Sequence, residues 1–218
     1  MERLIYVTGV SNLSFTPDLT IVKLRFSGWS NNYQDCMNKA ALDVSLIRNM
    51  LEVVGLDKKL LKTESYDIET HQEKVYYNNG EDYKYVNKGF DYYQTLKFSF
   101  NVSNDTLSKV INAISSLDLN PQFNLSFSVR DLESAKDKLI DAACKDAIKK
   151  AKLIASSSNI VLGNIVKIDY SKKDYDFDED YELGSRPRSY GCKIANIDIE
   201  PDDIVKACEV NMVFEIKD

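Results

Sequence analysis

Apolar residues recur at helical spacing along the stretch from Leu132 to Ser157. One row repeats every four residues and a second row lies beside it: Leu139, Ala143, Ala147, Ala151 and Ala155, then Ile140, Cys144 and Ile148. Residues at this spacing share one face of an α-helix. Because most of that face is small, the pattern predicts a helix over 132–157 whose axis lies close to the surface it covers, which we expect to be a sheet.

Two further stretches have helical spacing. The first covers 36–54 and is followed by Gly55, a residue type that commonly ends helices. The second begins with Ser103 or Asn104 as its N-terminal cap and continues to about Leu117. Both have one apolar face, so each is expected to pack against a sheet rather than stand free.

Strands are indicated elsewhere by alternating apolar and polar residues, a pattern with a period of two. The expected strands are 4–10, one that begins at Leu19, 61–71, 90–102, 122–129, 160–170 and a last one containing 208–216. The first two flank a turn signal with Pro17 and are expected to pair. The next two form a long β-hairpin over 63–101, whose tip at 72–90 we expect to project from the body.

These patterns give the order ββαββαβαββ. Such an order, with about three helices packed on antiparallel-rich sheets, is typical of an α+β fold. The Asn-Asn-Gly at 78–80 is a turn signal inside the expected hairpin tip.

Composition and charge exclude few functions. With 218 residues the chain can bury a core without disulfides or metal, as one large domain or two small ones. No apolar run approaches the roughly 18 residues of a membrane span. The formal net charge of −6 argues against general nucleic-acid binding, which needs clustered Lys and Arg. The lysines of the 132–157 helix alternate with aspartates, which predicts an exposed face with salt bridges.

The N-terminus, MERLIYVTGV, lacks the apolar core and the small-residue cleavage site of a signal peptide. As it stands, the sequence predicts a cytoplasmic protein, or a periplasmic or envelope protein if a leader has been removed. The cysteines show no CxxC spacing, so we expect reduced and mostly buried thiols at Cys36, Cys144, Cys192 and Cys208.

Residues 171–196 break the pattern, because they are acidic first and then carry Gly and Pro, which predicts a mobile acidic loop. Acids stand at every second position of its first part: Asp174, Asp176, Asp178 and Asp180. Calcium loops use such spacing, but Glu179 stands where the EF-hand has Gly, and Ser185 where it has its bidentate Glu. A solvated loop is therefore favoured over a calcium site, and we assign no metal or cofactor.

Few residues suggest catalysis. His71 is the only histidine, so every Ser-His-Asp or Cys-His arrangement would need it. Its position near the end of a predicted strand favours a surface histidine over a catalytic base. The GxxxxGK[ST] and GxGxxG phosphate-binding motifs are absent from the sequence. We therefore assign no catalytic residue.

A cluster of tyrosines in and beside the hairpin tip is the surface feature that most suggests a function: Tyr66, Tyr76, Tyr77, Tyr83, Tyr85, Tyr92 and Tyr93. Tyrosines suit interfaces because they combine a large apolar area with a polar end. They also stabilise hairpins through cross-strand pairs, and the two roles are compatible. The candidate interface residues are the four at the tip: Tyr76, Tyr77, Tyr83 and Tyr85.

Several short motifs follow one another along the chain: Ile5-Tyr6-Val7-Thr8-Gly9, Pro17-Asp18, Gly89-Phe90 and Leu162-Gly163. Asn124 to Phe127 then precedes a helix that contains Ala142, Asp146, Ala147, Lys150, Ala151 and Ala155. In order and spacing these motifs resemble the SIMPL domain family, a domain of unknown function, over nearly the whole chain. The resemblance implies a single SIMPL-like domain over residues 1–218.

What the resemblance implies about function is broad. Family members include periplasmic immunogenic proteins of Gram-negative bacteria and a eukaryotic kinase-associated signalling protein. Some are similar to large ring or barrel homo-oligomers, some are linked to oxidative-stress defence, and the family is not known as enzymatic. The sequence as given differs in showing no signal-peptide pattern at its N-terminus and in its acidic 171–182 stretch.

Three functional hypotheses follow. The first is a non-enzymatic assembly or interaction protein that self-associates through strand edges and tyrosines, so that its expected partner is another copy of the chain. The second is an enzyme or small-ligand binder whose site the sequence does not reveal. The third is a signalling adaptor. Because resemblance of fold does not establish function, the mass in solution is the first measurement that separates them.

Overall fold

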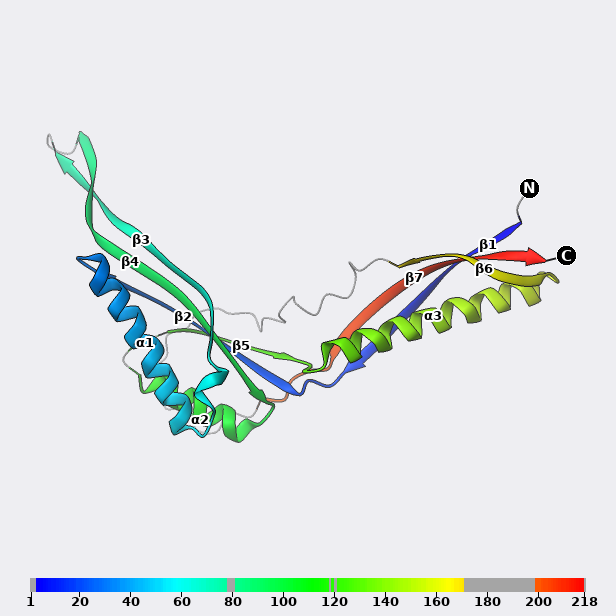
Figure 1. The fold of residues 1–218 in the computed structure, drawn as a ribbon, viewed down its shortest axis with the longest axis horizontal. Coiled ribbons are helices and arrows are strands. Elements are labelled where there is room, and N and C mark those ends of the chain that lie inside the picture. The colour runs from blue at the N-terminus through cyan, green and yellow to red at the C-terminus, as the bar shows by residue number, and fades with distance from the viewer. Residues whose placement is uncertain (1–2, 78–80, 118, 120, 171–198, 218) are drawn as a thin grey trace. The chain divides into compact units, whose positions relative to one another are not determined.

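The computed structural model describes residues 3–77, 81–117, 119, 121–170 and 199–217 (Figure 1). These residues form two compact units, each with its own sheet and core. Unit 1 consists of residues within 3–18, 128–170 and 201–217, and unit 2 of residues within 19–127 together with 199–200. The predicted order ββαββαβαββ and the α+β class are both confirmed.

Unit 1 is a three-stranded antiparallel sheet with a long helix packed on one face (Figure 1). Its strands lie in the order β1-β7-β6, and its elements are β1 Leu4–Phe15, α3 Leu132–Ser157, β6 Val161–Tyr170 and β7 Ile204–Lys217. The bounds of α3 match the predicted helix. Its alanine row is buried against alternate residues of β1 and β7, among them Ile5, Val7, Val210, Met212 and Phe214.

Gly9 marks a very close approach between β1 and α3. A Cβ atom built on Gly9 would lie 2.1 Å from the carbonyl oxygen of Ala143, and 2.6 Å from the backbone nitrogen of Ala147. Real Cβ atoms do not approach other atoms so closely, and helix backbone cannot rotate aside as a side chain can. The predicted closeness of the helix axis to a sheet is therefore confirmed, and the small residues on both elements are its cause.

Replacing Ala147 or Ala151 with Leu is expected to lower the free energy of unfolding by about 1–3 kcal/mol, the usual cost of overpacking a core. Both alanines are fully buried, so the larger side chain has no space. Denaturant unfolding followed by circular dichroism measures the change. Ala142→Leu is the matched control, because Ala142 lies on α3 outside the buried row. Equal midpoints for all three variants would contradict the assigned face.

Unit 2 is a four-stranded sheet in the order β3-β4-β2-β5 with two helices packed on one face (Figure 1). Its elements are β2 Leu19–Ser30, α1 Tyr33–Val53, the 3₁₀-helix η1 Lys58–Leu60, β3 Lys62–Tyr77, β4 Asp82–Asn101, α2 Asn104–Ser115 and β5 Gln122–Ser128. Ser103 is the N-terminal cap of α2, and Gly55 follows the end of α1 with a φ of +88°, both as predicted. The core includes the alternating apolar residues that the sequence indicates: Val22, Leu24, Phe26, Leu96, Phe98 and Phe100.

The expected pairing of the first two strands is wrong. β1 pairs with β7 along its whole length, and β2 pairs in the same way with β4. The reason is that β1 belongs to unit 1 and β2 begins unit 2, so each strand finds its partner in a different sheet. A short connection favours pairing of neighbouring strands but does not impose it.

The long hairpin predicted at 63–101 is confirmed by the pairing of β3 with β4, which extends to Tyr77 opposite Asp82. The last residue of β2, Ser30, pairs with Phe90, and beyond that point β3 and β4 continue as two strands alone (Figure 1). The hairpin therefore projects beyond the rest of its sheet. The described part of the expected tip consists of residues 72–77 and 81–90.

Candidate functional site

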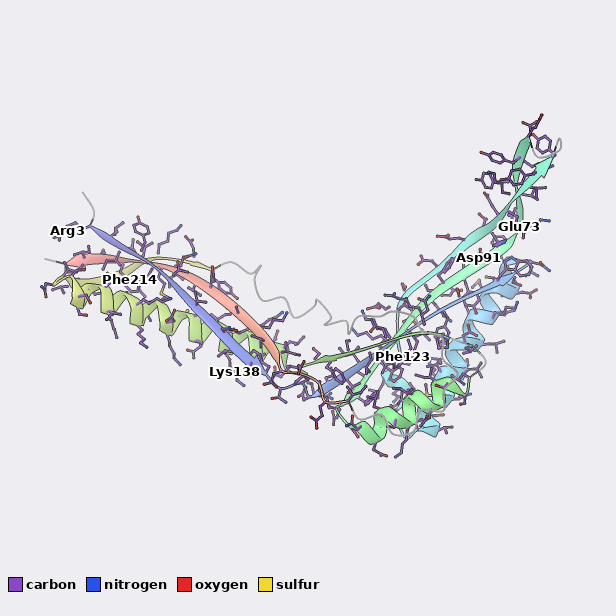
Figure 2. The ribbon with its side chains drawn as sticks, turned by 180° about the vertical axis from the view of Figure 1, so that it is seen from behind. Arg3, Glu73, Asp91, Phe123, Lys138 and Phe214 are labelled. Atoms are coloured by element: carbon purple, nitrogen blue, oxygen red, sulfur yellow. The ribbon has the colours of Figure 1, made fainter. Side chains whose placement is uncertain are left out.

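The projecting end of the hairpin carries three tyrosines and a lysine that contact one another. Tyr76 lies directly opposite Tyr83, and their ring centroids are 6.0 Å apart. Tyr83 also meets Tyr85 edge to face, with 5.8 Å between centroids. The ammonium nitrogen of Lys74 lies 3.7 Å from the ring centroid of Tyr83. We call these four residues the tip patch; Glu73, which directly precedes Lys74 on β3, is labelled in Figure 2.

Tyr77, the fourth candidate interface residue, lies apart from this group. Successive side chains of a strand point to opposite faces, so Tyr77 faces away from Tyr76. The exposed fractions are 57% for Tyr76, 51% for Tyr83 and 62% for Tyr85, and 48% for Tyr77. Cross-strand pairing, one of the two roles that the sequence suggests, is confirmed for Tyr76 and Tyr83. A role in an interface stays a prediction.

The tip patch is held in place by contacts among its own members. Edge-to-face ring packing and an ammonium over a ring are both attractive, because the face of an aromatic ring is negative and its edge positive. Cross-strand aromatic pairs contribute roughly 0.2–1 kcal/mol each. A two-stranded hairpin is otherwise marginal in water. These contacts therefore order an aromatic surface that still faces solvent.

A β-bulge lies at the base of the projecting part. The register of β3 on β4 shifts between His71 and Gln72, and Gly89 is the residue opposite His71. Gly89 has a φ of +146°, and a Cβ atom on it would lie 2.3 Å from the carbonyl oxygen of Ser30. Glycine alone suits both this backbone conformation and this space. Bulges bend and twist the strands that contain them, so this one sets the direction of the tip.

Gly89→Ala is expected to lower the free energy of unfolding by about 1–3 kcal/mol, the usual cost of one strained backbone position. The matched control is Gly55→Ala, because Gly55 also has a positive φ but no atom lies within 4 Å of a Cβ built on it. The difference between the two variants in urea unfolding isolates the contact with Ser30. Equal losses would contradict the close packing at the bulge.

His71 lies beside the bulge and contacts residues of β2, of β4 and of its own strand, β3. Its Nδ1 is 2.7 Å from Oδ2 of Asp91 on β4, and its ring meets Trp29 of β2 edge-on at 6.0 Å between centroids. Its Nε2 lies 3.8 Å from Oε1 of Glu73, and 33% of its side chain is exposed. The sequence favours a surface histidine. The contacts show a partly buried histidine that connects β2, β3 and β4 at the base of the tip. Its partners Asp91 and Glu73 are labelled in Figure 2.

The described cysteines are Cys36, Cys144 and Cys208, and they are thiols. Burial, and then the charge of Asp91, raises the pKa of the Cys36 thiol, and burial also raises the pKa of Cys144. A raised pKa keeps a thiol protonated at neutral pH, which makes it a weak nucleophile. These cysteines therefore suit packing better than reaction chemistry. Cys192 lies outside the described residues.

The whole of the predicted acidic loop at 171–196 lies outside the described residues. The same is therefore true of the candidate metal ligands in it: Asp174, Asp176, Asp178 and Asp180. Within the described ranges, no three His, Cys, Asp or Glu side chains are placed to hold a metal ion. Among the helices that the structure describes, none is both long and apolar enough to cross a membrane.

An ion pair on α3 binds the backbone of β1. Asp146 Oδ2 accepts a hydrogen bond from the Val10 backbone N–H at 2.9 Å, and Lys150 Nζ donates to the Thr8 carbonyl oxygen at 3.0 Å. The two side chains are 2.7 Å apart. β1 is an edge strand of its sheet, where such backbone groups are otherwise open to pairing with another strand. We call Asp146 and Lys150 the edge pair.

Acid is expected to weaken unit 1 partly through Asp146. The Lys150 ammonium, and then the Val10 N–H, hold the pKa of Asp146 below its usual range. A carboxyl with a lowered pKa stabilises the fold above its unfolded pKa of about 4, and this stabilisation is lost as the pH falls through the lowered value. The unfolding midpoint of the unmodified protein should therefore fall more steeply on acidification than that of Asp146→Asn. The control is Asp137→Asn, a change at an exposed position on α3, and its unfolding midpoint should depend on pH as that of the unmodified protein does. If the midpoints of all three proteins depend on pH in the same way, Asp146 does not contribute to acid sensitivity.

The sequence from residue 5 to residue 214 matches the model of the family described as SIMPL, a protein of unknown function (DUF541). The chain belongs to the SIMPL family. The resemblance seen in the sequence is thereby confirmed, and the match includes residues of both units. No curated protein matches the chain.

Several residues by which the chain resembles the SIMPL family have a structural reason in this fold. Gly9 lets β1 and α3 approach closely, the edge pair Asp146 and Lys150 binds β1, and Gly89 permits the bulge below the tip. The contacts of Gly9 and of the edge pair lie within unit 1, and those of Gly89 lie within unit 2. The SIMPL motifs therefore explain architecture, and the surface that the architecture presents at the tip is where a function is best sought.

Sequence reasoning missed Lys74 as a member of the candidate site. A signal was available, because Lys74 stands two residues before Tyr76 and so shares its face of the strand. By the same rule Tyr77 faces away from Tyr76, whereas the faces of Tyr83 and Tyr85 relative to them follow only from the register of β3 on β4. The contacts of His71 with Asp91 and Trp29 had no such signal, since they depend on the register of three strands.

Proposed function

We propose that this SIMPL-family chain is a non-catalytic assembly protein and that its tip patch binds another copy of the chain. The observation that carries the proposal is the tip patch itself, which is ordered by ring contacts, about half exposed, and placed beyond the rest of its sheet. Tyrosine is among the residue types that contribute most to protein interfaces. Exposed and ordered tyrosines are suited to that role.

The tip patch is also prepared for binding at low entropic cost. A partner that binds flexible side chains must immobilise them, at about 0.5–1.5 kcal/mol for each one. Here the rings of Tyr76, Tyr83 and Tyr85 are already packed together, and Lys74 lies over two of them. Most of the apolar area that a partner covers would therefore contribute to affinity.

Charges beside the tip patch favour a second copy as the partner. Glu73 and Asp82 carry negative charge within a few residues of Lys74 and Lys84. Two copies related by a twofold axis present the same surface to each other, so a surface with both signs can place unlike charges together. The net charge of −6 opposes association only at longer range, and salt screens it over about 8 Å at physiological ionic strength.

Light scattering over a series of protein concentrations tests the proposal. We expect a mass that is a whole multiple of the chain mass at tens of micromolar, and we expect it to persist at high salt because aromatic contacts are not screened. A single-chain mass across the whole series would contradict self-assembly.

A further inference from the structure

A hollow whose lining includes four basic residues lies in unit 2 where η1 leads into β3. Its volume is about 310 Å³, at the lower end of the range for small-ligand sites. The lining residues come from the end half of α1, from η1 and from the first part of β3: Arg48, Lys58, Lys59, Leu61 and Lys62. Leu61 is buried in the core of unit 2, so the hollow has one fixed apolar side.

The turn that presents the lysines is held by its own hydrogen bonds. The side chain of Asp57 accepts from the Lys59 backbone N–H at 2.8 Å, and the Leu61 N–H donates to the Lys58 carbonyl oxygen at 3.3 Å. Asp57 is thereby engaged with the backbone. Glu52 is engaged as well, because it pairs with Lys58 at 2.7 Å. Within the described ranges, Glu52 is the one of these two acids that forms an ion pair with a cation of the hollow.

The other cations form no ion pair within the ranges that the structure describes: Arg48, Lys59 and Lys62. In addition, Lys62 stands opposite Lys97 in the β3–β4 register, and like charges placed opposite each other across strands are destabilising. The hollow therefore carries positive charge that an anion from solution can neutralise.

We propose that this hollow binds a small multivalent oxyanion, of the kind that phosphate esters and pyrophosphates carry. The planar guanidinium of Arg48 can donate to two oxygens at once, and Lys59 and Lys62 add two point charges to the lining. A ligand with several charges is favoured over a monovalent anion, because three cations that form no ion pair within the described ranges line one hollow. The proposal is independent of the tip patch and adds a ligand to the proposed function.

The probe is inorganic pyrophosphate, titrated into the protein at constant ionic strength and followed by calorimetry. We expect saturable binding by the unmodified protein. The variant Arg48→Gln/Lys59→Gln/Lys62→Gln is expected to bind at least about tenfold more weakly, since each charged hydrogen bond contributes more than the roughly 1.4 kcal/mol that a factor of ten represents. All three side chains are exposed, and circular dichroism checks that the variant keeps its fold.

The matched control changes the same amount of charge elsewhere. Lys138→Gln/Lys149→Gln/Lys152→Gln alters three exposed positions on α3 and is expected to bind pyrophosphate like the unmodified protein. Equal weakening in the two triple variants would overturn the site, because it would show general attraction between charges. Absence of saturable binding by the unmodified protein at millimolar pyrophosphate would overturn it too.

Discussion

Gly9→Ala is expected to lower the free energy of unfolding by about 3 kcal/mol or more, at or above the upper end of the usual cost of overpacking. The added Cβ would meet the backbone of α3 at Ala143 and Ala147 rather than a side chain that can rotate. The helix must move away from the sheet to admit it. That movement also lengthens the hydrogen bonds of the edge pair to Thr8 and Val10.

Denaturant unfolding measures this effect, and Ser11→Ala is its matched control. Ser11 is the next residue on the inward face of β1, and its buried hydroxyl has no hydrogen-bond partner in the part of the chain that the structure describes. Removal of that hydroxyl should leave the stability unchanged or raise it. If Gly9→Ala unfolds at the same denaturant concentration as Ser11→Ala, the close approach of α3 to β1 is wrong.

In the variant Tyr76→Ser/Tyr83→Ser/Tyr85→Ser, the assembled protein is expected to give way to a species of lower mass. The few interface residues that cost about 2 kcal/mol or more when truncated are enriched in tyrosine, so the loss of three tyrosines should prevent assembly at tens of micromolar. The base of the hairpin keeps its pairing with β2, so the circular-dichroism spectrum should not change. Light scattering beside the unmodified protein measures the mass.

Tyr77→Ser separates the tip patch from the hairpin as a whole. Tyr77 has nearly the same exposed fraction as Tyr83, 48% against 51%, but lies on the opposite face. This variant should keep the mass of the unmodified protein. If the triple variant keeps that mass as well, the tip patch does not carry assembly, and the edge strands of the two sheets become the next candidates.

Much of the fold could be predicted from the sequence because its elements carry their own local signals. The helix at 132–157 and its buried alanine row follow from the spacing of small residues, and the face of β4 that carries Leu96 and Phe98 follows from alternation. The cap of α2 at Ser103 follows from its residue type. Each of these features depends on neighbours in the chain, so the sequence pattern contains it.

The features that could not be predicted depend on residues far apart in the chain. The partner of β1 is β7, nearly two hundred residues later, and nothing in the residues around Pro17 indicates this. The bulge at Gly89 and the contact of His71 with Asp91 follow from the register of β3 on β4. Pattern alone gives the face of a strand but not its partner. For the same reason the four tyrosines of the tip could be found in the sequence, but their division between two faces needed the paired hairpin.

The most direct test of assembly through the tip patch is photo-crosslinking from position 83. A photoreactive phenylalanine derivative replaces Tyr83, isotopically heavy and light chains are mixed before assembly, and mass spectrometry identifies the crosslinked peptides. Assembly through the tip patch predicts crosslinks between a heavy and a light chain, from position 83 to residues 72–77 or 81–86 of the other copy, and few such crosslinks from the same group at position 77. Crosslinks confined to single chains, or equal crosslinks between chains from positions 83 and 77, would contradict it.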